Sequence, residues 1–353
     1  MKLLGSFKFL PRSCVGIDIG TSSLKMVELS RWGSRKTLKN YGEIQASTLY
    51  DKPFRTFEKN TLMLSSEDIA RAVRAILLES KIETKEAVFS IPDFSSFFTY
   101  FELPLMSKEE LPQAVQYEAR KHVPLPFAEV TFDWQVIEQP PANSKKPFKI
   151  LLVAVPNEVI NQYQEIAKGA NLKLSALEAE VFGLIRSFLK EEKTPATVLD
   201  IGAQTTTVNI VWKGQLRNSH GIDIAGNSFT ERISQSLLID FSKAQELKSQ
   251  KGLLSLDIMG ILSPLLDMIV TEIQNITQTF EEREGVRIEK IVLGGGSSRM
   301  PGLKEYLEKN LSKEVEILDP FRSLFAPPIL ESTLKEMGPS YAVAVGMALR
   351  GLE

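Results

Sequence analysis

The segment GIDIGTSSLKMVEL begins at Gly16, and a similar segment, VLDIGAQTTTVNIV, begins at Val198. Each contains a short apolar run, then Asp-Ile-Gly, then a cluster of small polar residues. The two aspartates, Asp18 and Asp200, lie about half of the 353-residue chain apart. Solenoid repeats recur roughly every 20–50 residues. The spacing therefore indicates two related lobes, each large enough to bury its own core.

Each unit predicts a strand, a tight turn at the glycine and a second strand. A glycine lets the backbone approach a ligand closely because it has no Cβ. Successive backbone N–H groups in such a turn form a site for an anion, and hydroxyl groups can add donors to phosphate oxygens. The candidate phosphate-binding residues are Gly20, Thr21, Ser22, Ser23 and Lys25 in the first unit, and Gly202, Gln204, Thr205 and Thr206 in the second.

The aspartates suggest a bound cation. A carboxylate beside a polyphosphate would repel it unless a cation lies between them. Mg²⁺ is typically held by one or two carboxylates, phosphates and several waters. Asp18 and Asp200 therefore predict a Mg²⁺ held from both lobes, in part through water. The alternative is two β-hairpins in which Asp and Gly only form turns.

A third glycine-rich loop favours the nucleotide interpretation. It lies in IVLGGGSSRMPGLKEYL, which begins at Ile291 and predicts a strand, a loop and a helix. It matches neither the P-loop nor the dinucleotide-binding pattern. Three adjacent glycines permit close packing against an adenosine, and we expect Gly295 and Gly296 to resist side chains. The candidate adenosine-binding residues are Gly294, Gly295, Gly296, Ser297 and Met300.

Composition excludes some classes of protein. The chain is 43% hydrophobic and 24% charged, with a net charge of −2. These values are ordinary for a globular protein, and no basic excess predicts nucleic-acid binding. The single cysteine, Cys14, cannot form an intramolecular disulfide, and we expect it to act as a small apolar residue. No stretch approaches the roughly 18 apolar residues of a membrane span.

The first residues, MKLLGSFKFLPRS, combine basic and apolar side chains. Lys8 interrupts the apolar stretch, and no small-residue cleavage site follows it, so we expect no targeting peptide. We expect a frayed arm. Contact with a membrane surface or a partner is the alternative.

The three loops, in this order and spacing, resemble those of the actin-like ATPase superfamily, which includes actin, Hsp70, sugar kinases and FtsA. The resemblance implies an α/β, ribonuclease H-like fold whose two lobes close on Mg-ATP. KILLVAVPNEVINQYQEIAKGANL and YAVAVGMALRG are similar to its two connecting segments. By the same resemblance, Glu246 and Lys248 are candidates for contacting the ribose or adenine. A solvated helix face is the alternative for both residues.

The segment EARKHVPLPFAEVTFDWQV, from Glu118 to Val136, resembles the PilM family of type IV pilus assembly proteins. That resemblance implies a cytoplasmic, ATP-binding, FtsA-like protein with a small subdomain inserted in its first lobe. It also implies a partner: the N-terminal cytoplasmic peptide of PilN, a bitopic inner-membrane protein. The peptide would lie between the subdomain and the first-lobe core, and would associate the protein with the inner membrane. Val123, Leu125 and Phe127 are the expected wall of its groove.

The resemblance also divides the chain. The expected ranges are 1–100 for the first-lobe core with the first phosphate loop, 101–148 for the inserted subdomain, 149–195 for the continued first-lobe core, 196–225 and 286–339 for the second-lobe core with the second phosphate loop and the adenosine loop, 226–285 for a helical subdomain of the second lobe, and 340–353 for a C-terminal helix returning to the first lobe.

Catalysis is not predicted from the sequence. Turnover needs a group that orients the attacking water, and Asn157, Glu158 and Asn161 are equal candidates for it. We expect a nucleotide-dependent structural switch with slow or absent hydrolysis. The alternatives are a filament-forming protein of the FtsA type and a small-molecule kinase, although no clear aspartate base follows AVP. Other pilus proteins or a second copy of the chain are further candidate partners.

Overall fold

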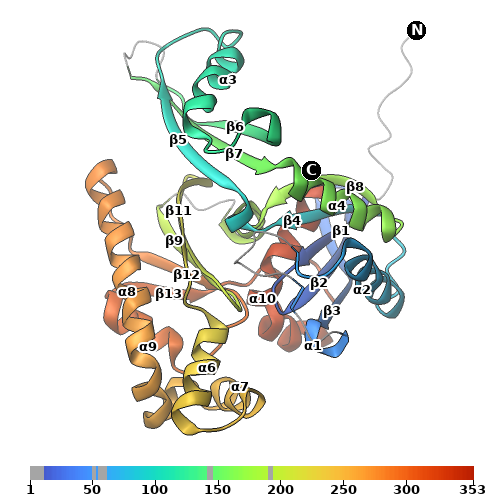
Figure 1. Cartoon of the computed structure of the whole chain (residues 1–353), viewed down its shortest axis with the longest axis vertical. Helices are drawn as coiled ribbons and strands as arrows, with labels where there is room; N and C mark the ends of the chain where they lie inside the picture. The colour runs from blue at the N-terminus through green and yellow to red at the C-terminus, as the bar shows by residue number, and fades with distance from the viewer. Residues whose placement is uncertain (1–11, 50–52, 55–61, 141–145, 190–193) are drawn as a thin grey trace.

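The computed structural model describes residues 12–49, 53–54, 62–140, 146–189 and 194–353. Most of the predicted N-terminal arm, residues 1–11, lies outside the described residues. Two five-stranded sheets and one three-stranded sheet organise the described chain. Figure 1 shows the two larger sheets side by side, with the smaller sheet at one end of the long axis.

The first lobe is built on a sheet with the strand order β3-β2-β1-β4-β8. Its strands are β1 (Arg12–Ile19), β2 (Ser23–Trp32), β3 (Arg35–Gln45), β4 (Glu86–Ile91) and β8 (Lys173–Ala179). Helices α2 (Ser66–Glu79) and α4 (Asn157–Gly169) pack on one face, against Val15, Ile17 and Ile19 of β1. The short helices of this lobe are α1 (Ala46–Leu49), α5 (Glu180–Leu184) and the π-helical turn Ile185–Leu189 that follows α5.

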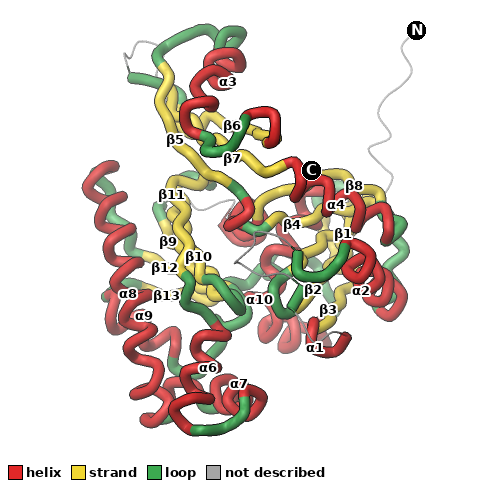
Figure 2. The backbone as a smooth tube through the Cα atoms, in the orientation of Figure 1, coloured by secondary structure: helices red, strands yellow, loops and turns green. Residues whose placement is uncertain are grey.

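The second lobe repeats this topology, with the strand order β11-β10-β9-β12-β13. Its strands are β9 (Ala196–Ile201), β10 (Thr206–Trp212), β11 (Gln215–Ile222), β12 (Lys290–Gly294) and β13 (Glu314–Ile317). Its helices are α6 (Gly226–Leu237), α7 (Phe241–Gln250), α8 (Leu256–Glu284) and α9 (Leu303–Leu311). Leu199 and Ile201 of β9 pack with the apolar side of α8 in one core. Figure 2 shows these helices outside the sheet.

The repeated Asp-Ile-Gly sequence folds as the same hairpin twice. Asp18 pairs with Lys25 across β1 and β2, and Asp200 pairs with Thr207 across β9 and β10. In each turn the glycine N–H donates to a carbonyl three residues on, at 2.9 Å from Gly20 and at 3.0 Å from Gly202. The duplication in the sequence is therefore a duplication of structure.

Helix α10 (Glu331–Gly351) lies between the two lobes. Residues 341–349 are all buried, in a core that includes Val88 of the first lobe and Val198 and Val292 of the second. A Cβ on Gly16 of β1 would overlap the backbone of α10 at Ala344 and Ala348. A Cβ on Gly346 would overlap the backbone of Gly183 in α5. The small residues of the helix thus permit direct contact between backbones.

The C-terminal helix begins earlier than the sequence predicts. Pro339 lies inside α10 and cannot donate a hydrogen bond to the carbonyl of Lys335. Arg299 Nη1 donates to that carbonyl instead, at 2.9 Å. The helix therefore continues through Pro339, and it starts at Glu331 rather than near residue 340.

The small subdomain consists of β5 (Phe97–Leu103), α3 (Leu111–His122), β6 (Val130–Glu138) and β7 (Phe148–Pro156). Its antiparallel sheet has the order β5-β7-β6. Val115 and Ala119 of α3 pack on one face, against Ile150 and Leu152 of β7. The first and last strands of this unit extend beyond residues 101–148 on both sides. The loop from Pro140 to Pro147 joins β6 to β7, and residues 141–145 of it lie outside the description.

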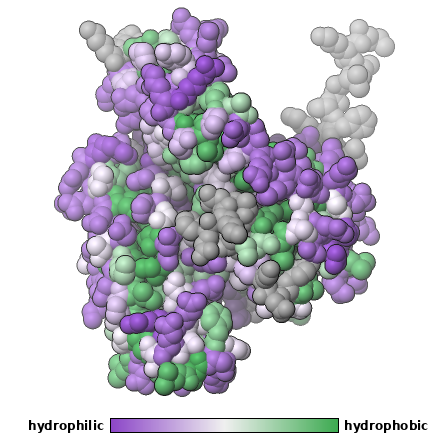
Figure 3. All heavy atoms as spheres, viewed as in Figure 1, coloured by the Kyte–Doolittle hydropathy of each residue, from purple (hydrophilic) through white to green (hydrophobic). Residues whose placement is uncertain are grey.

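Several large apolar side chains are exposed at the opposite end of the molecule. Figure 3 shows hydrophobic residues gathered at the lower end of the second lobe. Leu238, Leu254 and Leu256 are exposed there, and Leu238 is 91% exposed with a positive φ of 53°. Three-residue 3-10 turns cover Asp93–Ser95, Phe127–Glu129, Gly252–Leu254 and Pro328–Leu330.

Replacing Gly346 by Ala should destabilise the protein by about 3 kcal/mol, because the new methyl group must displace the backbone of Gly183. Gly260→Ala is the matched control, since Gly260 is also helical and a Cβ there meets no atom within 4 Å. That change should stabilise the protein by roughly 0.5–1 kcal/mol. Chemical denaturation measures both free energies of unfolding. Equal effects at the two positions would contradict the packing described for α10.

Candidate functional site

The two predicted metal-binding carboxylates lie on the faces of the two sheets that border α10. Side chains two residues apart on a strand share a face. Gly16, which contacts α10, is two residues before Asp18, and Val198, in the core around α10, is two residues before Asp200. Both carboxylates therefore lie on the inner side of their sheet, at the end of the strand.

Asp18 is held in place by a neighbouring strand. Its side chain is 8% exposed, and Ser90 Oγ of β4 donates to Asp18 Oδ1 at 2.8 Å. Ser90 is not among the site residues predicted from the sequence. No local motif marks it, because its role depends on the parallel pairing of β1 with β4.

Asp200 is held against the glycine loop. Gly295 has a φ of 85°, which favours glycine, and a Cβ on it would lie 2.5 Å from Asp200 Oδ1. The Gly295 N–H donates to the carbonyl of Pro339 in α10, at 3.1 Å. Gly295 therefore resists a side chain even without a ligand. A Cβ on Gly296, in contrast, would meet no atom within 4 Å. The protein itself leaves room for a side chain at Gly296, so resistance at this position would have to come from a bound adenosine.

The first turn is fixed through its carbonyls. The carbonyl of Thr21 accepts from Phe54 N at 3.0 Å, and that of Ser22 accepts from Ala46 N at 2.8 Å. Lys25 Nζ donates to Ser23 Oγ at 2.5 Å. The same ammonium lies 3.6 Å from Glu43 Oε1. The turn thus has a defined backbone and one cation beside it.

The second turn meets the start of α6 and the glycine loop. The carbonyl of Gly202 accepts from Gly226 N at 3.0 Å and from Ser297 Oγ at 3.5 Å. Ser297 N also donates to the carbonyl of Ile201, at 3.1 Å. Thr206 Oγ1 donates to the carbonyl of Ile224 at 2.6 Å, so this hydroxyl is engaged within the protein.

Lys248 belongs to this group of loops. It is 6% exposed, and its Nζ donates to the Gly226 carbonyl at 2.7 Å and to Thr230 Oγ1 at 2.8 Å. A Cβ on Gly226 would lie 3.5 Å from that Nζ and 2.5 Å from Ser297 Oγ. Burial disfavours the charged ammonium and lowers the pKa of Lys248 to about 8. An anion brought close would stabilise the charged ammonium and raise this pKa.

Two candidates lie apart from this group. Glu246 is exposed and pairs with Lys243 Nζ at 2.7 Å, and that hydrogen bond lowers the pKa of the carboxyl. Its alternative interpretation, a solvated helix face, fits this position. Met300 follows the glycine loop, but its side chain is buried in the second-lobe core. Proximity in the sequence was the only signal for Met300.

The candidates for water activation lie at the start of α4. Asn157 Oδ1 accepts from Thr131 Oγ1 at 2.8 Å, and Asn157 Nδ2 donates to the carbonyl of Ala128 at 3.0 Å. Asn157 therefore joins α4 to the small subdomain. Glu158 and Asn161 are exposed on the same helix. These contacts give no basis for assigning a catalytic role.

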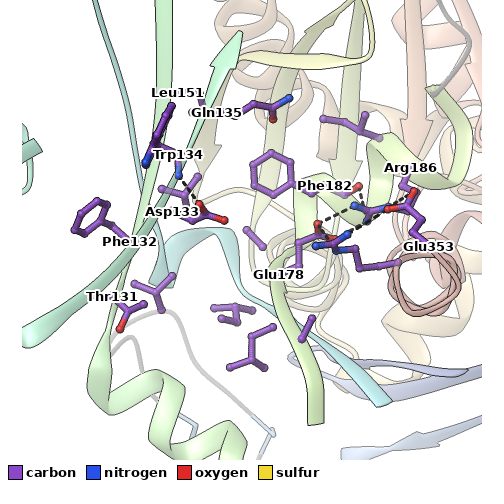
Figure 4. A pocket seen from close by; sticks show the side chains of 18 of the residues that line it. Thr131, Phe132, Asp133, Trp134, Gln135, Leu151, Glu178, Phe182, Arg186 and Glu353 are labelled. Atoms are coloured by element: carbon purple, nitrogen blue, oxygen red, sulfur yellow. Dashed lines mark hydrogen bonds and ion pairs between the residues drawn. The ribbon is translucent and has the colours of Figure 1, made fainter. Parts of the chain in front are cut away.

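A separate groove of about 850 Å³ lies between the small subdomain and the first lobe, and residues 213–215 of the second lobe also line it. Figure 4 shows β6 and β7 on one side and the segment from Glu178 to Arg186 on the other. Arg186 pairs with Glu178 and lies 3.5 Å from Glu353 Oε1. The lining residues are Ile91, 131–135, Leu151, Val153, Val155, Ile160, Gln164, 174–179, Phe182, Ile185, Arg186, 213–215, Arg350 and Glu353.

The residues expected to form the groove wall lie elsewhere in the subdomain. Val123 is buried with α3, and Leu125 and Phe127 pack on the same core. None of the three lines the groove. Phe127 packs against one lining residue, Phe132, and the centroids of the two rings lie 4.9 Å apart. The sequence pointed to the subdomain that borders this groove but not to the lining residues, which come from several distant segments of the chain.

Stability should depend on pH through Lys248. Below pH 8 the ammonium is charged in both folded and unfolded states, and the full cost of burying it is present. Between pH 8 and the ordinary pKa of 10.5 only the unfolded state holds the proton, so the free energy of unfolding rises with pH.

We expect a rise of about 2 kcal/mol from pH 7 to pH 10, relative to Lys248→Met, in chemical denaturation without nucleotide. The variant removes this titration but keeps a side chain of similar length. Parallel pH profiles for the two proteins would show that Lys248 is not desolvated.

Comparison with known proteins identifies the family. The profile of the family described as type IV pilus assembly protein PilM matches residues 16–352. A solved PilM-PilN type IV pilus biogenesis complex has a chain that is 26% identical, with a TM-score of 0.83. The match covers 96% of this chain and 98% of the other.

More distant relatives share part of the chain or only the fold. FtsA of Staphylococcus epidermidis is 26% identical over 175 residues, and FtsA of Neisseria meningitidis is 21% identical over 234 residues. These matches cover 43% and 56% of this chain, and 38% and 53% of the respective relatives. The chain thus spans about half of their length or less.

MreB5 of Spiroplasma citri bound to AMPPNP is 12% identical, with a TM-score of 0.51 over 96% of this chain and 95% of the other. These similarities confirm the predicted α/β, two-lobed actin-like fold. No helix in the part of the chain that the structure describes is long and apolar enough to cross a membrane. With its profile match over nearly the whole sequence, the chain belongs to the PilM family of type IV pilus assembly proteins.

Proposed function

We propose that this chain is a cytoplasmic ATP-binding adaptor that captures the N-terminal peptide of a PilN-type inner-membrane protein. The observation that carries the proposal is the groove between the small subdomain and the first lobe. It is supported by the similarity, over nearly the whole chain, to a protein solved in a PilM-PilN complex. Association with the inner membrane would follow from the partner.

The residues between the lobes fit a magnesium–nucleotide complex. Asp18 and Asp200 supply two inward carboxylates, and the described residues contain no group of three or more potential metal ligands. Two carboxylates suffice for Mg²⁺, which retains waters and takes phosphate oxygens. When bound, Mg²⁺ would supply the positive charge that offsets these carboxylates and the phosphates. The turns that begin at Gly20 and Gly202 would bring the N–H groups of later turn residues to the phosphates, since the N–H groups of both glycines are bonded within the turns. The open side of Gly296 would admit the adenosine.

The buried ammonium of Lys248 supports the same assignment. The Lys248 ammonium donates to a carbonyl and a hydroxyl, neither of which balances its charge. A buried cation without a counter-charge is costly. A nearby ligand anion would relieve that cost and contribute to affinity.

Losing either carboxylate should weaken Mg-ATP binding by at least about tenfold, since each supplies half of the proposed cation site. Asp18→Asn and Asp200→Asn keep the shape and remove the charge. Asp257→Asn, at an exposed position on α8, is the control and should bind as the wild type does. Calorimetry decides the matter, and wild-type affinity in both site variants would refute the cation site.

The two neighbouring glycines should behave differently. Gly296→Ala should leave the melting temperature of the free protein unchanged, because the protein offers no clash, yet weaken ATP binding at least about fivefold. Gly295→Ala should lower the melting temperature without any nucleotide, because of its φ and its contact with Asp200. If Gly296→Ala binds ATP normally, the adenosine does not lie on this loop.

A charge on the floor of the groove should prevent peptide capture. Val153 is half-buried on β7 and lines the groove, so Val153→Glu would place a carboxylate under the peptide. We expect at least a tenfold loss of peptide affinity with Mg-ATP binding retained. Tyr117→Glu adds the same charge to the exposed side of α3 and should have no effect. Fluorescence anisotropy of a labelled peptide measures the peptide affinity of both variants. Unchanged binding in Val153→Glu would place the peptide elsewhere.

A further inference from the structure

The lining of the groove shows how its walls are oriented. β6 contributes five consecutive residues, 131–135, and β8 contributes six, 174–179. Successive side chains of a strand point to opposite faces, so one face alone would contribute alternate residues. β7 does so, with Leu151, Val153 and Val155. The floor of the groove is therefore a face of β7, and its walls are the edges of β6 and β8.

Both walls are outer strands of their sheets. β6 ends the order β5-β7-β6, and β8 ends the order β3-β2-β1-β4-β8. Within the described ranges, no strand pairs with the outer edge of either. An open edge presents a row of backbone donors and acceptors that can pair with another extended chain.

One hydrogen bond shows which backbone N–H groups of β6 point to its outer edge. The N–H of Trp134 donates to the side chain of its neighbour Asp133, at 2.8 Å, as Figure 4 shows. An N–H directed at β7 would pair with that strand, so the Trp134 N–H points to the outer edge. Residues alternate in this respect along an antiparallel strand, so the Phe132 N–H points outward as well. The exposed carboxylate of Asp133 therefore accepts a hydrogen bond from the Trp134 N–H, which an added strand would otherwise use.

The pairing of β6 is regular where the groove is formed. Residues 130–136 of β6 pair with β7 without interruption. β8, in contrast, has an irregularity in its pairing with β4 between Ala87 and Val88. Irregular pairing disturbs an edge as a template for another strand. The edge of β6 is therefore the better template of the two.

We propose that the partner peptide binds as a fourth strand on the outer edge of β6, displacing the Asp133 carboxylate from the Trp134 N–H. This inference rests on the proposed function and specifies the partner: an extended segment with apolar side chains at alternate positions. Those side chains face Leu177, Phe182 and Ile185 across the groove. Main-chain hydrogen bonds supply affinity, and the alternate side chains supply specificity.

Peptides methylated on backbone nitrogens test the strand directly. The probe is a synthetic peptide with the N-terminal cytoplasmic sequence of the PilN-type protein from the same organism. Methylation of alternate amides in one phase should weaken binding at least about 30-fold, since several hydrogen bonds are lost. Methylation in the other phase should change the affinity less than about threefold. Equal effects of the two phases would refute strand addition.

Two measurements on the protein locate the edge. Bound peptide should slow hydrogen exchange at the Phe132 and Trp134 amides, and slowed exchange confined to β8 would refute the choice of β6. Asp133→Ala should tighten peptide binding roughly threefold or more by freeing the Trp134 N–H. Asp133→Asn keeps an acceptor, so its peptide affinity should lie closer to that of the wild type.

If the unmodified peptide does not bind at all, the proposed function is wrong. If it binds without any difference between the two phases, only the strand addition is wrong.

Discussion

The packing of α10 against backbone is the constraint on which the rest of the structure depends. Gly16 and Gly183 allow β1 and α5 to touch the helix without intervening side chains. The helix thereby joins the cores of both lobes, including Val88 and Val292. Asp18 follows Gly16 on the same face of β1, and the Gly295 N–H is bonded to the helix at Pro339. The positions of both proposed nucleotide-binding elements therefore follow from this one interface.

Local patterns made the two hairpins predictable. Asp-Ile-Gly after an apolar run specifies a strand and a turn within a few residues, and the structure repeats the hairpin with the same register. The start of α10 could not be read in the same way. Pro339 suggests the beginning of a helix, and only the distant Arg299 supplies the donor that Pro339 lacks. Ser90, which holds Asp18, was hidden for a related reason, since its role arises from strand pairing.

The groove was the least predictable part of the candidate site. A resemblance in sequence pointed to the small subdomain, but Val123, Leu125 and Phe127 serve the core beneath α3. The walls come from residues 131–135 and 174–179, which approach one another only in the folded chain. Nothing within either segment marks an open strand edge, because openness depends on what the remaining strands leave unpaired.

The central claim is that one chain holds a nucleotide between its lobes and a membrane protein's peptide beside its small subdomain. A crystal structure of the chain with Mg-AMPPNP and the synthetic PilN-type peptide tests this most directly. The account predicts Mg²⁺ between Asp18 and Asp200, with the peptide extended between β6 and β8. A nucleotide bound outside the lobes, or a peptide bound away from this groove, would contradict it.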